Sequence, residues 1–66
     1  MSQNLKDQIS GFSNFKFDEQ TNMILNQNSL AHADVDQFLE IMYILDSNFV
    51  KYDMTRTYDL KILGRR

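Results

Sequence analysis

The chain contains no cysteine, so a disulfide framework and a thiolate zinc site are both excluded. Its only two glycines, Gly11 and Gly64, are too far apart in the sequence to build a phosphate-binding loop. The longest apolar run, residues 41–45, is far shorter than the roughly 20 residues that span a bilayer. The polar start of the chain holds no signal-peptide core. These absences predict a reduced, soluble, cytoplasmic protein that does not bind membranes.

What is present is typical of one folded domain over residues 1–66. The chain is 42% hydrophobic and its formal net charge is only −2, which excludes obligate disorder. A domain of this length buries only about 60% of the surface that its unfolded chain exposes. Because no disulfide supplements so small a core, we expect self-association or a protein partner to add stability.

The first part of the chain predicts a helix and then a hairpin. Leu5 and Ile9 lie four residues apart on one side of a short helix over residues 1–11. Aromatic residues then alternate with polar ones, which is the spacing of a strand, and a second apolar run follows after a polar stretch. This pattern predicts a β-hairpin over residues 14–27.

Apolar residues at helical spacing predict the main helix over residues 30–48. Either Ser29 or Asp34 caps its start, and Gln37, three residues after Asp34, matches a capping box. The stripe that we expect to face the core consists of Val35, Phe38, Leu39, Met42 and Leu45.

Alternating apolar and polar residues then predict a second hairpin or a terminal strand over residues 49–63, followed by a tail over residues 64–66. A helix is the alternative, because Met54, Tyr58 and Ile62 are also spaced four apart. The expected fold is therefore α+β, with one amphipathic helix packed on a short antiparallel sheet. The alternative fold is a three-helix, all-α bundle.

Few residues have the arrangement of a catalytic or metal site. His32, Asp34 and Asp36 occupy alternate positions, so in an extended segment they would share one face and suit a divalent cation. Acidic residues at a helix N-terminus are the more ordinary interpretation of the same pattern. Asp36 and Glu40 lie on a solvated face without the cleft that acid–base catalysis needs. We expect no enzyme activity, no cofactor and no bound metal.

Charge is distributed unevenly along the chain. Residues 1–50 carry two basic and seven acidic side chains, a net charge of −5, and residues 51–66 carry five and two, a net charge of +3. Cations interleaved with aromatic rings are typical of a surface that binds single-stranded nucleic acid or an acidic partner. The pI of about 5.0 instead favours a solubilising C-terminal segment, and the asymmetry is also suited to steering head-to-tail self-association. The candidate contacts are Lys51, Tyr52, Arg56, Tyr58, Lys61, Arg65 and Arg66.

Two isoleucines of the main helix, Ile41 and Ile44, are expected to point away from its core-facing stripe. Their pairing across a two-fold axis predicts a homo-oligomer. The function that these features favour is a non-catalytic protein–protein interaction module that acts as a small oligomer on a macromolecular partner. Small free-standing proteins of this kind are common among the accessory proteins and inhibitors that phages and mobile elements encode. Nucleic-acid binding through the basic C-terminal third is the alternative.

Overall fold

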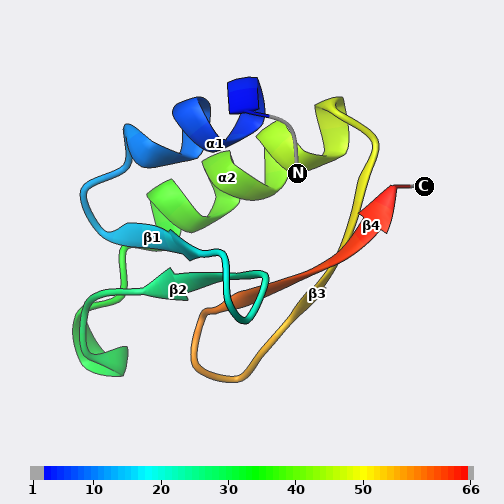
Figure 1. Ribbon diagram of the computed structural model, residues 1–66. Helices are drawn as coiled ribbons and strands as arrows, with labels where there is room; N and C mark the ends of the chain where they lie inside the picture. Colours follow the sequence, from blue (N-terminus) through cyan, green and yellow to red (C-terminus); the bar gives the residue numbers. More distant parts are fainter. Residues whose placement is uncertain (1–2, 66) are drawn as a thin grey trace.

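The computed structural model describes residues 3–65 and has the α+β fold that the sequence predicts. Two helices lie on one face of a four-stranded antiparallel sheet with the strand order β1-β2-β4-β3 (Figure 1). The all-α alternative is therefore wrong. In chain order the elements are α1 (Gln3–Ser10), β1 (Phe15–Asp18), β2 (Met23–Asn26), the 3₁₀ turn η1 (Leu30–His32), α2 (Val35–Ser47), β3 (Val50–Met54) and β4 (Leu60–Arg65). The predicted contact Arg66 lies outside the described residues.

The core lies between the two layers. Helix α1 packs on β1, while α2 packs on β3, so together the helices cover one face of the sheet. The ring of Phe38 stacks on Phe15 of β1, with 5.8 Å between the ring centroids, and meets Tyr58 edge-on at 5.4 Å. The buried side chains are Leu5, Ile9, Phe15, Ile24, Phe38, Ile41, Leu45, Val50, Leu60 and Ile62.

Helix α2 is rotated about its axis relative to the prediction. Phe38 and Leu45 of the expected stripe are buried and Met42 packs partly against the core, but Val35 and Leu39 are exposed. The fully buried Ile41 completes the inward face in their place. The prediction failed because apolar residues occur on several sides of this helix, so hydrophobic periodicity alone does not select one side.

Asp34 caps the start of α2, as one of the two sequence alternatives predicts. Its Oδ1 accepts a hydrogen bond from the backbone N–H of Gln37 at 3.0 Å. Its Oδ2 accepts from the side-chain amide of Asn14, also at 3.0 Å, and the side chain of Gln37 in turn accepts from the backbone N–H of Asn14 at 3.2 Å. The cap therefore also fastens the segment before β1 to the start of α2.

The structure contains the C-terminal hairpin that the sequence predicts. The alternation of Tyr58, Leu60 and Ile62 with polar residues predicts that the last strand includes Tyr58, but the strand begins after it. Tyr58 lies in the β3–β4 turn with a left-handed φ of 59°, and β4 begins at Leu60. The carboxylate of Asp59 accepts a hydrogen bond from the backbone N–H of Asn26 at 2.8 Å, which joins the turn to the end of β2. A register shift lies near the other end of the hairpin, at Gly64. The φ of Gly64 is 126°, a backbone conformation that residues with a side chain rarely adopt.

Candidate functional site

The outer side of α2 carries large apolar side chains that the fold leaves uncovered. Val35, Leu39 and Tyr43, which we call the α2 stripe, are 45%, 56% and 72% exposed. They follow one another at intervals of four residues, so they lie along the same side of the helix over about 12 Å. The sequence pattern did not predict this surface, because the helical spacing of Val35 and Leu39 places both in the expected core-facing stripe. Their side chains instead form an elongated apolar strip that faces solvent.

The helix that carries this stripe is strongly acidic. Asp34 caps it, Asp36, Glu40 and Asp46 lie within it, and no lysine, arginine or histidine occurs between residues 33 and 50. Asp36, Glu40 and Asp46 are all exposed. Every charged side chain of α2 is therefore acidic, so the helix itself contributes a negative potential beside the stripe.

Phe49 follows the end of α2 in a conformation that favours glycine. Its φ is 57°, its backbone N–H donates to the carbonyl oxygen of Asp46 at 3.1 Å, and its side chain is 70% exposed. A left-handed backbone costs a bulky residue about 1–2 kcal/mol. Tyr58 has a similar φ, but its ring packs on Phe38 and the core, whereas Phe49 buries little. Burial of the Phe49 ring therefore does little to offset the strain of its left-handed backbone.

The sheet face turned away from the helices has the opposite sign of charge. Lys16, Lys51 and Lys61 are exposed, and each stands between two residues that pack into the core, so all three point to the outer face. By the same alternation and the strand register, Met23 and Leu25 lie on this face, and exposed Leu63 follows the buried Ile62. The face also carries Asp18 and Asp53, which leaves a net charge of +1 among these side chains.

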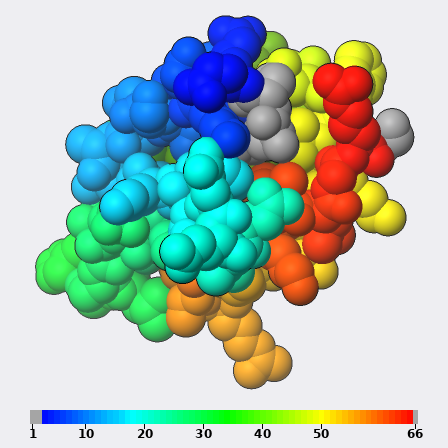
Figure 2. All heavy atoms as spheres, in the orientation of Figure 1, coloured from blue at the N-terminus to red at the C-terminus, as the bar shows by residue number. Residues whose placement is uncertain are grey.

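The structure separates the tyrosines of the C-terminal third from its cations. Tyr52 and Tyr58 pack against the core on the helix side of the sheet, whereas Lys51 and Lys61 point to the other side. The exposed Arg56 lies in the β3–β4 turn, which projects from the body of the molecule (Figure 2). Arg65 pairs with Val50 at the opposite end of the hairpin. The rings and cations that are interleaved in the sequence therefore do not share one surface.

The two isoleucines predicted to form an interface have different positions. Ile41 is fully buried in the core, so the expectation that it points outward is wrong, and its side chain is not available to a second chain. Ile44 is half-buried, packs against the core and lines a shallow hollow with Phe12, Gln37 and Glu40 between the two helices. The prediction failed for the same reason that the core stripe failed, because the rotation of α2 turns Ile41 inward.

The alternate residues His32, Asp34 and Asp36 do not converge. Both carboxylate oxygens of Asp34 accept hydrogen bonds within the N-terminal cap of α2, while His32 ends η1 and Asp36 lies in the first turn of α2. Within residues 3–65, no three histidine or acidic side chains come close enough together to hold a metal ion. The helix-cap interpretation accounts for Asp34.

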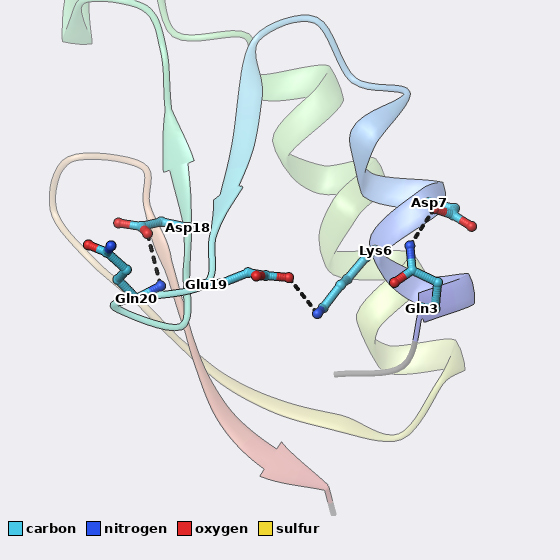
Figure 3. Close-up of polar contacts among 6 residues, drawn as sticks. All are labelled: Gln3, Lys6, Asp7, Asp18, Glu19 and Gln20. Atoms are coloured by element: carbon cyan, nitrogen blue, oxygen red, sulfur yellow. Dashed lines mark hydrogen bonds and ion pairs between the residues drawn. The ribbon is translucent and has the colours of Figure 1, made fainter.

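An open hollow of about 950 Å³ lies along α1 and β1. Lys6 reaches from α1 to Glu19 in the β1–β2 turn, with 2.6 Å between Nζ and Oε1 (Figure 3). The hydrogen bond from Lys6, together with its charge, holds the pKa of Glu19 below the ordinary value of a glutamate. Lys6 Nζ also lies 5.8 Å from the centroid of the Phe17 ring. These contacts fasten α1 to the hairpin and account for the charged pair without a ligand.

Comparison of the chain with protein-family models, with curated proteins and with solved structures finds no match. Among the described residues, neither helix has the length and apolar character needed to cross a membrane.

Proposed function

We propose that this chain is a non-catalytic protein-binding module whose docking surface is the α2 stripe together with Phe49. The observation that supports the proposal is the exposure of four large apolar side chains along α2 and just beyond its end. Exposed apolar surface that is contiguous along one element is characteristic of protein–protein contacts. Tyrosine and other rigid aromatic residues are common anchors in such contacts.

The strained backbone and the exposed ring of Phe49 also support this proposal. An exposed aromatic ring at a left-handed position is unfavourable for folding, and such local strain occurs preferentially at functional sites. Phe49 lies two residues beyond the last residue of α2, at the same end of the helix as Tyr43. A partner that covers this end of α2 would bury the ring and recover the apolar contact that the isolated fold lacks.

In this role the chain acts in the cytoplasm as a small oligomer, and as an adaptor or inhibitor of a macromolecular partner, in the manner of accessory proteins of phages and mobile elements. The fold offers such a protein a rigid helix, held at its start by the Asp34 cap and along its length by Phe38, Ile41 and Leu45. Rigid anchors lose little side-chain entropy when a partner binds.

The test is affinity capture from the native host with the full chain and two matched variants. Leu39 and Leu30 are 56% and 55% exposed, but Leu30 belongs to η1 outside the α2 stripe. We expect Leu39→Ser to lose the captured partner and Leu30→Ser to retain it, with both variants as stable as the parent. If both variants retain the same partner, the α2 stripe is not the docking surface.

Nucleic-acid binding is the second candidate function, and the three exposed lysines on the outer sheet face favour it. The lysines would contact phosphates without stacking from Tyr52 and Tyr58, which pack on the other side of the sheet. Binding to single- or double-stranded oligonucleotides at about 50 mM salt tests it directly, since phosphate contacts are strongest at low ionic strength. The absence of binding there excludes this candidate.

A further inference from the structure

Two outward surfaces of the molecule are complementary in character. The α2 stripe is apolar and flanked by Asp36, Glu40 and Asp46. The outer sheet face is also partly apolar, through Met23, Leu25 and Leu63, and carries Lys16, Lys51 and Lys61. The helices cover only one side of the sheet, so the outer sheet face is turned away from the helix layer that contains α2 (Figure 1).

We propose that the α2 stripe of one copy docks on the outer sheet face of a second copy, so that chains associate head to tail. This proposal rests on the proposed function, because it names the occupant of the same α2 surface. It replaces the symmetric pairing of α2 helices that the sequence predicts. A contact between two different faces is heterologous, and each added copy presents both faces again.

Charge selects this arrangement over a symmetric one. A two-fold pairing of α2 helices would bring the acidic side chains of one copy, including Asp36 and Glu40, against those of the other, and α2 itself contains no lysine, arginine or histidine. Like charges placed opposite one another across an interface suppress the contact. Docking on the sheet instead places these carboxylates near Lys16, Lys51 and Lys61, which outnumber the two aspartates on that face. Asp53 lies directly opposite Lys61 in the strand register, so the charges of these two side chains offset each other, and Lys16 and Lys51 remain against Asp18.

The molecule is large enough for such a contact. A stable interface covers about 800 Å² on each partner. The chain exposes 4504 Å² in all and measures 31 × 22 × 21 Å, so one face of the sheet or of the helix layer offers an area of that order. Covering the second face of the sheet also gives it the layer of helices that two-sided sheets have within larger domains.

Mixing two differently blocked variants tests the proposal. Leu39→Asp adds a charge to the α2 stripe and Leu63→Asp adds one to the outer sheet face, and both sites are exposed, so both variants are expected to fold. Sedimentation at millimolar concentration and low salt should show each variant alone as a monomer. An equimolar mixture should form a discrete dimer, because the intact stripe of Leu63→Asp meets the intact sheet face of Leu39→Asp. Each single substitution should weaken association by at least about tenfold, and Leu30→Asp should leave it unchanged.

Several outcomes overturn the proposal. Dimers of Leu63→Asp alone show that α2 pairs with α2, and dimers of Leu39→Asp alone show that sheet pairs with sheet. A mixture that remains monomeric, or a parent chain that remains monomeric at millimolar concentration, removes head-to-tail association. In that last case the proposed function still stands if Leu39→Ser loses a captured partner that Leu30→Ser retains, so the two proposals fail separately.

Discussion

Phe49 and Tyr58 have almost the same φ, 57° and 59°, but their side chains have opposite surroundings. Tyr58 packs edge-on against Phe38, and this burial offsets the strain of its left-handed backbone. Phe49 has the strain and little burial, since 70% of it is exposed. At the scale of single residues, this difference separates a residue that stabilises the fold from one that is available to a partner.

Replacing each of the two residues by glycine should therefore change stability in opposite directions. Phe49→Gly relieves the left-handed strain and should raise the free energy of unfolding by about 1 kcal/mol, or Tm by about 4–8 °C. Tyr58→Gly relieves similar strain but removes a packed ring, so it should lower Tm. Thermal unfolding followed by circular dichroism measures both. A lower Tm for Phe49→Gly would show that its ring supports the fold after all.

The Lys6–Glu19 pair predicts a small pH dependence of stability. Because the pKa of Glu19 is lower in the folded chain than in the unfolded chain, the pair stabilises the fold above the ordinary glutamate pKa, and this contribution disappears as the pH falls through the lowered value. Urea unfolding should therefore show Glu19→Gln as slightly less stable than the parent at neutral pH. The two proteins should become equal once Glu19 is protonated in both states. A difference that persists unchanged in acid would mean that the pair is not its cause.

At the scale of elements, the cap of α2 is the local feature that the sequence predicts best. Asp34 followed by Gln37 is recognisable without a structure because capping depends on residues only three positions apart. The outcome differs in one respect: the side chain of Gln37 hydrogen-bonds to Asn14 and Ser13 in place of completing the capping box. Local sequence therefore predicts where the helix begins, and only the folded chain shows what its first turn holds in place.

Removing this cap should destabilise the protein measurably. Asp34→Ala leaves the backbone N–H of Gln37 and the side-chain amide of Asn14 without the carboxylate, and should cost about 1 kcal/mol. Asp36→Ala removes an exposed carboxylate of the same helix turn and should cost less than about half of that. Denaturant midpoints of the two variants give the comparison. Equal midpoints would contradict the role assigned to Asp34.

The strand and helix segments were largely predictable, whereas the orientation of α2 was not. Alternation at Phe15 and Phe17 and at Leu60 and Ile62 identifies strands because a sheet with one covered face buries every second residue. In α2 the choice between Leu39 and Ile41 as the inward residue depends on what Phe38 meets across the core, and Phe15 and Tyr58 come from distant parts of the chain. The candidate surface was missed for the same reason, since its residues were assigned to the core.

The orientation of α2 can be checked by truncating one inward and one outward residue. Ile41→Val removes a methyl group from a fully buried site and should cost about 0.5–1.5 kcal/mol. Leu39→Ala removes a larger group from an exposed site and should change stability by less than about 0.5 kcal/mol. The larger cost for the smaller deletion is the distinguishing result. The reverse order in chemical denaturation would place Leu39 inside and Ile41 outside.

At the scale of the whole molecule, the uneven charge of the sequence becomes a division between two surfaces. The acidic residues 1–50 include α2, and the basic residues 51–66 supply two of the three lysines of the outer sheet face, Lys51 and Lys61, while Lys16 comes from β1. A linear charge count predicts such a dipole but not which faces carry it, because strand alternation decides which side chains point outward. Both charged surfaces also carry apolar side chains, on the α2 stripe and on the outer sheet face, and these side chains are available for association.

Sedimentation equilibrium of the full chain tests most directly the claim that the α2 stripe is a docking surface for a second copy. Between micromolar and millimolar concentration at low salt, the apparent mass of the parent and of Leu30→Asp should rise above the 7.8 kDa of a single chain, and added salt should lower it. Leu39→Asp should keep the mass of a single chain throughout, together with the circular dichroism spectrum of the parent. A parent chain that keeps the monomer mass at every concentration, or a Leu39→Asp variant that associates as the parent does, would contradict the claim.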